Sequence, residues 1–436
     1  MKTVAFHTLG CKVNQYDTEA IATQFIEAGY EIVDFDQPAD VFVINTCTVT
    51  NMSDRKSRQM IRRASRNNPQ AKIVVVGCFA QTAPEEVQAI PGVNLVVGTN
   101  DRGQIVQLVE KLDLDEGYSL VGEIFQVDDF EEMSVTSFQG RTRAFLKIQD
   151  GCNQFCSYCK VPYARGKSRS RKSENIKEEV NNIVSQGYRE IVLTGVHLGG
   201  YGSDLQPASS LAKITELISH IPGVQRVRIS SVDPNEIDQH LLELLANNPH
   251  VCRHLHIPLQ SGSDTILEKM RRKYRTTDYL QIVEKARELV PNIALTTDVI
   301  VGFPGESDEL FQETYDFIKS IGFAKLHVFK YSPRTGTPAA SFPEQVSNVD
   351  KERRSHQLIQ LSDEMAFQFH QQFLGEIVEV LVEGQESDTV TGFTDNYLRV
   401  TGSFTKISEE LVGQLVKVKI NSVDAHQLTG ILVEDV

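Results

Sequence analysis

Apolar runs of strand length alternate with amphipathic windows of helical period over most of this 436-residue chain. This alternation constrains the fold more than any other feature, because repeated strand and helix units indicate parallel sheets covered by helices. From Thr3 to about Leu112 it predicts an α/β, Rossmann-like domain with a parallel sheet. The expected strands are Thr3–Leu9, Asp40–Asn45, Lys72–Gly77 and Asn94–Gly98, and the expected helices are Tyr16–Ala28, Ser53–Asn67 and a short one opened by Pro84.

A second stretch, from Arg143 to about Gln372, repeats the strand and helix alternation six times. Six units are too many for a small open sheet and too few for a complete eight-unit barrel. The pattern therefore favours an open six-unit β/α barrel with a last helix near Lys351–Phe373. Its expected strands are Arg143–Gln149, Glu190–Gly195, Arg226–Ser230, His254–Leu259, Ile293–Gly302 and Lys325–Tyr331.

The tail from Gly375 consists of short alternating runs punctuated by glycines. Closely spaced strands of this kind predict a small antiparallel β-barrel. A polar, acidic stretch with little helical period separates the first two units and is interpreted as a linker. The predicted organisation is thus 1–118 for the first domain, 119–140 for the linker, 141–372 for the barrel and 373–436 for the tail.

Composition supports an ordinary globular protein, with 40% apolar and 23% charged residues. Met1–Asn14 has a single lysine and no long apolar stretch, so we expect no secretory signal. No run approaches the roughly 18 apolar residues of a membrane span. We therefore expect a soluble, monomeric protein of the cytoplasm. The net charge of −14 speaks against a polyanionic partner unless basic side chains are clustered locally.

The chain has seven cysteines, an odd number that favours metal or catalytic chemistry over disulfides. Cys152, Cys156 and Cys159 form a C-x3-C-x2-C run directly after the first barrel strand. Three thiolates on one loop can hold a metal cluster but leave it one ligand short, since ordinary iron–sulfur clusters use four cysteines. A zinc knuckle is the alternative, but zinc sites usually pair two such groups, and no second pair or histidine follows nearby.

Cys11, Cys47 and Cys78 form a second set, each directly following an apolar strand of the first domain. Because the carboxyl ends of parallel strands lie along one edge of a sheet, we expect these three thiols to converge. The alternative is that they are buried cysteines acting as small hydrophobes. The repetition at three successive strands predicts a second three-cysteine cluster site. Cys252 stands apart from both sets and is interpreted as a buried structural thiol.

The cysteine loop on a β/α barrel resembles that of the radical S-adenosylmethionine superfamily. The resemblance implies a 4Fe–4S cluster whose open iron binds S-adenosylmethionine and splits it to a 5′-deoxyadenosyl radical. Further similar segments, Leu193–Gly202, Ser230–Ser231, His256–Gly262 and Asp298–Glu306, follow later strands. Phe155 and Tyr158 either cover the cluster or simply pack the loop. The cofactor contacts implied in this way are Phe155, Tyr158, Gly195, Ser230, Gln260, Val301 and Tyr331.

Two such cysteine sets followed by a small β-barrel resemble the methylthiotransferase family over nearly the whole chain. Phe6–Ala20, Ile44–Asn51, Gly77–Gln81 and Cys156–Arg171 are similar to the branch that acts on threonylcarbamoyladenosine in tRNA. The resemblance implies two 4Fe–4S clusters, two equivalents of S-adenosylmethionine and an external flavodoxin- or ferredoxin-like electron donor. The implied reaction puts a methylthio group on carbon 2 of the adenine at position 37, in the tRNA anticodon stem-loop.

Three alternatives remain open at this point. Sister branches modify isopentenyladenosine of tRNA or an aspartate of a ribosomal protein. An RNA-binding iron–sulfur or zinc protein without turnover is the non-enzymatic alternative, although structural sites normally have four protein ligands. The homolytic step requires no acid–base residue, so no catalytic side chain is nominated.

An RNA substrate requires cationic surface, because phosphate contacts supply most nonspecific affinity. Two basic runs border the cysteine loops, one on a helix face after Cys47 and one after Cys159, although charge runs are often only solvated faces. Threonylcarbamoyladenosine also carries a carboxylate that needs a partner when buried, and Arg165 and Arg334 are possible partners. The predicted RNA contacts are Arg55, Arg58, Arg62, Arg165, Lys167, Arg169, Arg171 and Arg334. The tail from Phe373 is acidic, which is unexpected for a unit that contacts RNA.

Overall fold

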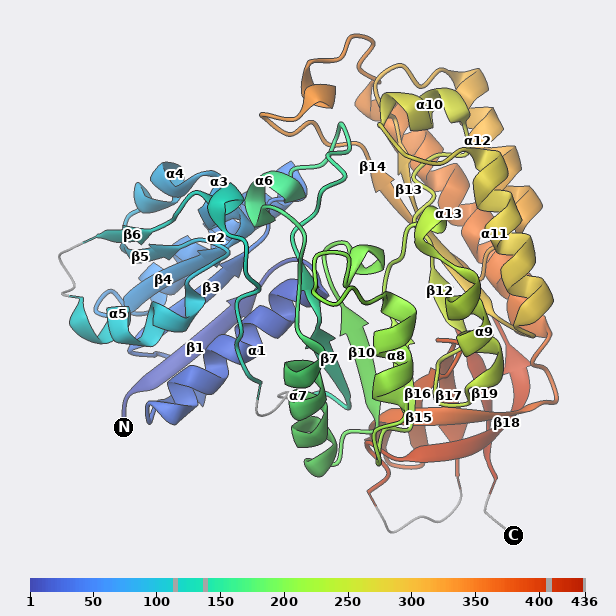
Figure 1. Cartoon of the computed structure of the whole chain (residues 1–436), viewed down its shortest axis with the longest axis horizontal. Coiled ribbons are helices and arrows are strands. Elements are labelled where there is room, and N and C mark those ends of the chain that lie inside the picture. Colours follow the sequence, from blue (N-terminus) through green and yellow to red (C-terminus); the bar gives the residue numbers. More distant parts are fainter. Residues whose placement is uncertain (113–116, 136–139, 405–409, 434–436) are drawn as a thin grey trace.

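Three units follow one another along the chain in the computed structural model, which describes residues 1–112, 117–135, 140–404 and 410–433 (Figure 1). An α/β domain, coloured blue to cyan, stands beside an open barrel coloured green to orange. A small closed barrel, coloured red, lies at one end of the open barrel. The α/β class and the succession of three units confirm the fold expected from the sequence.

The N-terminal domain is a six-stranded parallel sheet in the order β2-β1-β3-β4-β5-β6. The four expected strands are present to within one or two residues. The edge strands β2 and β6 were not predicted, because each has only three residues, too few to show a period. The strands are β1 (Thr3–Thr8), β2 (Glu31–Val33), β3 (Val41–Thr46), β4 (Lys72–Gly77), β5 (Val93–Val97) and β6 (Tyr118–Leu120).

Helices cover both faces of this sheet, which is why its central strands are mostly apolar and buried. All six residues of β3 are buried. One face packs against α1 and α5 through Phe25 and Val109, and the other packs against α2 through Ile61. The helices are α1 (Lys12–Glu27), α2 (Asn51–Asn67), α3 (Cys78–Thr82), α4 (Pro84–Gln88) and α5 (Ile105–Lys111).

The segment predicted as a linker is packed where the structure describes it. Its first two residues belong to β6, so the sheet crosses the expected boundary between residues 118 and 119. Met133 and Val135 are buried in the core of the barrel. Glu131 forms an ion pair with Arg102 of the N-terminal domain at 2.7 Å. The segment therefore joins the first two units through contacts that its polar composition does not reveal.

Six parallel strands form the open barrel, as the six-unit pattern predicts. They make two triplets, β7-β10-β11 and β12-β13-β14, linked by parallel bridges such as Ser231 to His256. The barrel is open between β7 and β14, and α1 packs against β7. The strands are β7 (Arg143–Lys147), β10 (Glu190–Thr194), β11 (Arg226–Ile229), β12 (His254–His256), β13 (Ala294–Val301) and β14 (Lys325–Lys330).

Helices line the outside of the open barrel (Figure 1). They are α7 (Ser173–Ser185), α8 (Leu211–Ser219), α9 (Gln239–Asn247), α10 (Asp264–Lys269), α11 (Thr276–Leu289), α12 (Asp308–Ile321) and α13 (Asn348–Gln371). A short pair, β8 (Gln149–Asp150) and β9 (Arg169–Ser170), brackets the cysteine loop together with α6 (Val161–Arg165). Within the described parts of the chain, no helix has both the length and the apolar character needed to cross a bilayer.

The tail closes into a five-stranded barrel in the order β15-β16-β17-β19-β18. Four neighbouring pairs are antiparallel, but β17 and β19 are parallel, which differs from the fully antiparallel expectation. The reason is geometric, because five strands cannot alternate in direction around a closed ring without one parallel pair. The strands are β15 (Ile377–Glu386), β16 (Thr389–Thr394), β17 (Arg399–Ser403), β18 (Leu415–Val423) and β19 (Leu428–Leu432).

Candidate functional site

Cys11, Cys47 and Cys78 lie together at one edge of the N-terminal sheet. Cys11 is the residue before α1, Cys47 follows β3 directly, and Cys78 is the first residue of α3 directly after β4. A methyl group added at Gly10 would lie 3.0 Å from Cβ of Cys47, so the first two loops touch. Burial raises the pKa of Cys78 to about 12, and the charges of Cys47 and Cys11 act in the same direction. The three thiols are therefore close enough to influence one another.

Side-chain hydrogen bonds hold these three loops in register. Asn14 donates from Nδ2 to the carbonyl of Leu9 at 2.7 Å and to that of Thr46 at 3.0 Å. The hydroxyl of Thr46 donates to the carbonyl of Val76 at 2.6 Å. Gly77 has φ +95°, and a Cβ there would lie 2.3 Å from Oδ1 of Asn45. Only glycine therefore allows the approach that brings Cys78 to the other two cysteines.

Cys152, Cys156 and Cys159 occupy the loop between β8 and α6. The amide of Cys159 donates to the carbonyl of Cys156 at 3.0 Å, which folds the loop tightly. Gly151, just before the loop, has φ +74°, and a Cβ there would lie 1.8 Å from the carbonyl oxygen of Lys167. Burial raises the pKa of Cys152 and of Cys159 to about 12. All six cysteines of the two triads are free.

The donor set of each triad fits a multi-iron cluster better than a single ion. In the described ranges, His197, Asp233 and Glu236 are the one set of histidine, cysteine or acidic side chains whose ligand atoms all lie within 4.8 Å of one another. Neither cysteine triad is that compact, so neither matches a tetrahedral zinc site with its short ligand bonds. Three free thiols at wider spacing suit an iron–sulfur cluster with one iron left for another ligand.

In each triad, one thiol accepts a hydrogen bond from an arginine. Arg165 donates from Nε to Sγ of Cys78 at 3.4 Å, and Arg272 donates from Nη1 to Sγ of Cys156 at 3.3 Å. A guanidinium beside a metal-bound thiolate stabilises its negative charge and fixes its orientation. Sequence reasoning missed both contacts, because a basic run does not show which of its members turns inward.

A cavity of about 1080 Å³ lies beside β14, at the open side of the barrel, and all three units contribute to its walls. Cys11 and Lys12 come from the N-terminal domain, and Arg399 comes from the closed barrel. Gly195 and Ser230, two predicted cofactor contacts, follow β10 and β11 and line the same space. Its other walls include Gln15, Thr194, Ser231, His254, His256, Thr296, Asp298, Lys325, His327, Phe393 and Tyr397.

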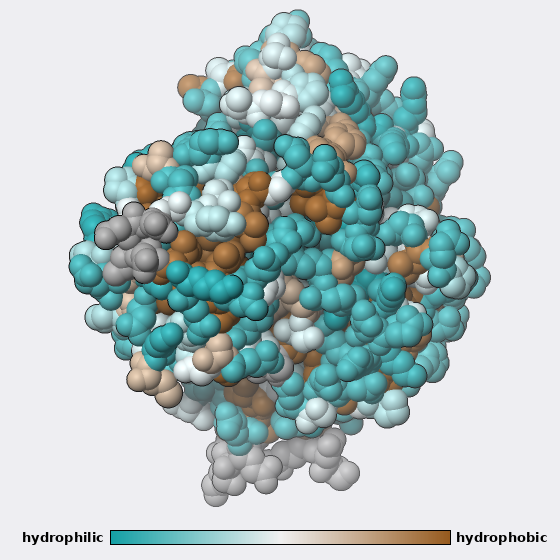
Figure 2. Space-filling view, turned by 60° about the vertical axis from the view of Figure 1, so that its left-hand side comes forward, coloured by the Kyte–Doolittle hydropathy of each residue, from teal (hydrophilic) through white to brown (hydrophobic). Residues whose placement is uncertain are grey.

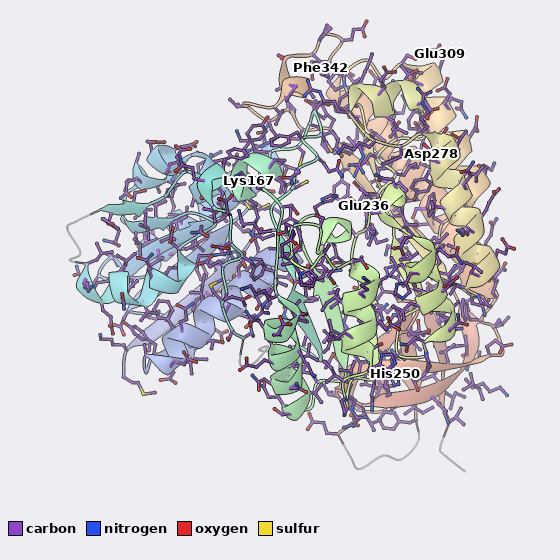
Figure 3. All side chains as sticks on the ribbon, in the orientation of Figure 1. Lys167, Glu236, His250, Asp278, Glu309 and Phe342 are labelled. Carbon is purple, nitrogen blue, oxygen red and sulfur yellow. The ribbon has the colours of Figure 1, made fainter. Side chains whose placement is uncertain are left out.

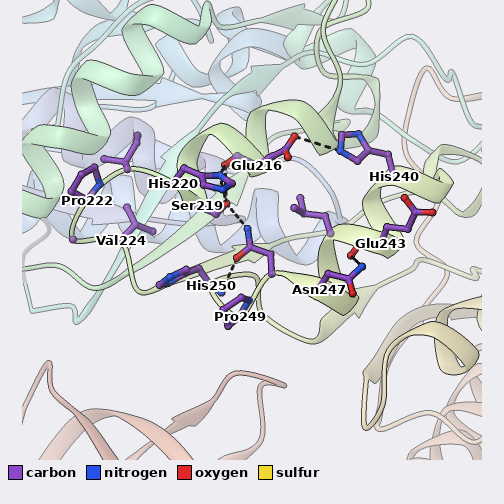
Figure 4. Close-up of a pocket in the computed structure, with 14 residues that line it drawn as sticks. Glu216, Ser219, His220, Pro222, Val224, His240, Glu243, Asn247, Pro249 and His250 are labelled. Carbon is purple, nitrogen blue, oxygen red and sulfur yellow. Dashed lines mark hydrogen bonds and ion pairs between the residues drawn. The ribbon is translucent and has the colours of Figure 1, made fainter.

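A second hollow, of about 700 Å³, lies between α8 and α9 on the outside of the open barrel (Figure 4). Its side chains interact with one another, as His240 does with Glu216 at 3.5 Å. No cysteine is among its lining residues. The central cavity, with Cys11 in its wall, is therefore the candidate active site.

Two family descriptions match the two cysteine-bearing units. Residues 3–98 match the family described as "Uncharacterized protein family UPF0004", and residues 146–318 match the "Radical SAM superfamily". The chain is 49% identical to the threonylcarbamoyladenosine tRNA methylthiotransferase MtaB of Bacillus subtilis, over 96% of this chain and 94% of the relative. It belongs to the MtaB methylthiotransferase family. The protein is accordingly a radical S-adenosylmethionine transferase whose cofactors are an iron–sulfur cluster and S-adenosylmethionine.

Other relatives and solved structures agree with this family. The MtaB of Aquifex aeolicus is 40% identical over 96% of this chain and 100% of its own. A tRNA-2-methylthio-N(6)-dimethylallyladenosine synthase of Carboxydothermus hydrogenoformans is 36% identical over 98% of this chain and 98% of its own. The radical methyltransferase TsrM of Kitasatospora setae has a TM-score of 0.58 at 17% identity, covering 78% of this chain and 77% of its own. At that identity the last likeness supports the fold alone.

Four arginines predicted to contact RNA are buried in this methylthiotransferase. Arg165, with 1% of its surface exposed, donates to Asp150 at 3.0 Å and to Asp17 at 2.9 Å. Arg169 donates to the carbonyl of Arg165 at 3.0 Å. The predicted phosphate contacts of Arg165 and Arg169 are therefore wrong, because the run after Cys159 folds into the seam between two units instead of onto the surface.

The same correction applies to Arg171 and Arg334. Arg171 is buried and bonds to Glu132 at 2.7 Å and to Glu179. Arg334 is buried, donates to the hydroxyl of Thr48 at 2.7 Å and pairs with Asp54. Carboxylates of this chain thus already neutralise the charge of both guanidinium groups. Neither Arg165 nor Arg334 is free to bind the carboxylate of a substrate.

The remaining predicted RNA contacts stay on the surface. Arg55 and Arg62 are exposed on α2, and Lys167 is exposed beside α6 with Asp128 at 2.8 Å (Figure 3). Arg58 is half-buried, pairs with Glu86 at 2.7 Å and lies over the ring of Phe79. The side of the molecule on which the N-terminal domain comes forward is mostly hydrophilic, with apolar patches between (Figure 2).

The predicted cofactor contacts other than Gly195 and Ser230 differ in their exposure and in their neighbours. Phe155, within the cysteine loop, is 39% exposed and stacks on Phe125 with 6.2 Å between the ring centroids. Tyr158 and Tyr331 pack around Phe303 in an apolar cluster beside that loop. Gln260, at φ +65°, bridges to β13 through its backbone. Val301, the last residue of β13, is completely buried in the barrel core.

Proposed function

We propose that this protein adds a methylthio group to carbon 2 of threonylcarbamoyladenosine at position 37 of tRNA. The observation that carries the proposal is the shared cavity. Cys11 of the first triad lines the same space as Gly195 and Ser230, which follow strands neighbouring the loop of the second triad. A base in this cavity would therefore lie beside the first triad and at the strand ends where contacts to S-adenosylmethionine are expected. The names of the relatives that are 49% and 40% identical support the choice of base.

The side chains of the protein have separate tasks in this proposal. Cys11, Cys47 and Cys78 would hold one iron–sulfur cluster, and Cys152, Cys156 and Cys159 would hold the other. When bound, these clusters and S-adenosylmethionine supply the one-electron chemistry and the methylthio group. Arg165 and Arg272 orient one thiolate of each triad. Apolar and aromatic walls such as Phe393 exclude water from the cavity, which protects reactive species from side reactions.

The partners belong to the same proposal. The substrate is the anticodon stem-loop of tRNA, and the exposed arginines of α2 are the proposed phosphate contacts. Reduction of the clusters requires an external electron donor, for which we propose a flavodoxin- or ferredoxin-like protein. We further propose that the protein acts as a monomer and in the cytoplasm, where its tRNA substrate is found.

Mass spectrometry of tRNA nucleosides tests the proposal. We expect cells that lack the gene to lose methylthio-threonylcarbamoyladenosine and to regain it when the gene is returned. A gene carrying Cys152→Ala should not restore the peak, which serves as the control for an indirect effect. If only the methylthio derivative of isopentenyladenosine responds, the assigned base is wrong although the chemistry is retained.

A further inference from the structure

The proposed substrate imposes an electrostatic requirement on the central cavity. Threonylcarbamoyladenosine carries a carboxylate at the end of its N6 side chain. A carboxylate that enters a partly desolvated cavity without a partner costs several kcal/mol. The cavity should therefore offer a cation that no carboxylate of the protein already neutralises.

Most cations near the cavity are already paired. Arg165 and Lys147 are bound to Asp17 and Asp150. Arg228 donates to Glu190 at 2.6 Å, and Arg143 pairs with Glu383 at 2.6 Å. The cations that line the cavity itself and lack an internal carboxylate partner in the described ranges are Lys12, Lys325 and Arg399.

These three cations differ in how far their side chains are exposed to solvent. Lys325 and Arg399 are exposed, so a carboxylate bound there would stay hydrated and gain little. Lys12 is only partly accessible and shares the cavity wall with the phenol of Tyr397. The charges of Glu190, Arg143 and Arg228 also act on it, but none of these three residues lines the cavity. Asp298, which carries the one carboxylate among the described lining residues, pairs with His256 at 3.2 Å. Lys12 is therefore the cation whose charge a bound anion would compensate best.

The backbone around Lys12 adds to its attraction for an anion. Lys12 is the first residue of α1, a helix of 16 residues. No side chain caps the first turn of α1, and no acidic residue lies in it. Gly10, Cys11, Lys12 and Val13 all line the cavity. The unsatisfied amides and positive dipole end of α1 therefore lie at the cavity wall beside the ammonium group.

The short distance between Cys11 and Lys12 also suits the short distance between the two relevant positions of the base. Carbon 2, the proposed site of reaction, and carbon 6, whose amino nitrogen N6 bears the side chain, flank the same ring nitrogen of adenine. Consecutive residues have Cα atoms about 3.8 Å apart. A base that directs carbon 2 toward the triad of Cys11 thus has its N6 substituent within reach of Lys12.

We propose that Lys12 is the specificity-determining residue that binds the carboxylate of the threonylcarbamoyl side chain. The inference rests on the proposed function for the identity of the base. It makes Lys12 the residue that distinguishes this substrate from adenosines with an uncharged N6 substituent. It also replaces Arg165 and Arg334, which the sequence suggested for this task.

The test compares two RNA stem-loops that differ only in the charge of the side chain. One carries threonylcarbamoyladenosine at position 37, and the other carries its carboxamide analogue. Product formation by reconstituted protein and RNA binding by fluorescence anisotropy are measured for wild type, Lys12→Gln and Lys12→Arg. Lys285→Gln, which removes an exposed lysine of α11, is the matched control. The ratio of carboxylate to carboxamide RNA within each variant cancels losses from folding or cluster loading.

We expect the wild type and Lys285→Gln to prefer the carboxylate RNA and Lys12→Gln to lose at least about 10-fold of that preference. Lys12→Arg should keep part of the preference, because it retains the charge. If Lys12→Gln forms no product, the binding ratio decides. An unchanged ratio in Lys12→Gln overturns the inference while leaving the proposed function intact. If the wild type modifies neither of these RNAs but does modify one with isopentenyladenosine, the proposed function fails and the inference with it.

Discussion

At the scale of single residues, the position of a cysteine at the end of a strand determines its role. Cys11, Cys47 and Cys78 each follow a parallel strand, and the topology of the sheet brings them together. Cys252 is as buried as Cys47 and Cys78 but lies near Arg228 and Glu190 instead. Burial alone therefore does not distinguish a proposed ligand from a structural thiol.

This difference leads to a prediction about iron content. Reconstituted wild-type protein should bind about eight irons, as two 4Fe–4S clusters require. Alanine at Cys152, Cys156 and Cys159 should halve this number and abolish deoxyadenosine formation. Alanine at Cys11, Cys47 and Cys78 should also halve it but leave cleavage of S-adenosylmethionine intact while stopping methylthio transfer. Iron analysis and chromatography of products measure both effects, with Cys252→Ala as the control that keeps all iron. Wild-type cleavage by the first triple variant would contradict the assignment.

At the scale of elements, α2 packs one face against the sheet and exposes arginines on another. Ile61 and Ala64 pack against the sheet, whereas Arg55 and Arg62 are exposed. Arg63, on the same helix, bonds to Asp36. With Arg66 and half-buried Arg58, Arg55 and Arg62 also line a shallow hollow of about 550 Å³ along α2. Cationic surface thus lies on the helix that directly follows the loop of Cys47.

The exposed pair on α2 should control the salt dependence of tRNA binding. The double variant Arg55→Gln and Arg62→Gln removes at most two phosphate contacts. The slope of log affinity against log salt concentration should therefore fall by at most about two. Filter binding at several salt concentrations measures the slope. Arg63→Gln is the matched control and should leave it nearly unchanged. An unaltered slope in the double variant would show that α2 presents only a solvated face.

At the scale of the whole molecule, a buried ionic network joins the N-terminal domain to the open barrel. Asp17 of α1 pairs with Lys147 of β7 at 2.9 Å and with Arg165 of α6 at 2.9 Å. Arg102 also pairs with Asp17. Burial raises the pKa of Asp17, but the charges of Arg102, Lys147 and Arg165 outweigh burial and lower it to about 2. These ion pairs thus link α1, which follows Cys11, to β7 and α6, which lie on either side of the second cysteine loop.

Removing Arg165 should disrupt this seam. Arg165→Ala leaves Asp17 and Asp150 short of a partner in a site closed to water. Breaking a buried pair in this way costs about 3–5 kcal/mol of unfolding free energy. Thermal and chemical denaturation measure the loss. Lys167→Ala, two residues further along but exposed, is the control and should change the melting temperature little. Equal stability of the two variants would show that the network contributes no net energy.

The sequence by itself determined the order of the elements and the positions of both cysteine triads. Strand and helix periods are local, so β1, β3, β4 and β5 were predicted to within one or two residues. The same holds for five of the six parallel strands of the open barrel, whereas β12 ends three residues before the predicted Leu259. The ends of parallel strands share one edge, so three cysteines at strand ends had to be neighbours once the class of sheet was known. β2 and β6 were missed because three residues are too few to show a period.

The tertiary structure alone decided which charged residues face solvent, substrate or one another. Arg165, Arg169 and Arg171 form a basic run, yet all three are buried, because their partners Asp17, Asp150 and Glu132 come from distant segments. Lys12 has no such partner within the described ranges and lines the cavity. The charge of a side chain can be read locally. Its partner depends on which segments folding brings together, so the free energy of that charge is a property of the whole molecule.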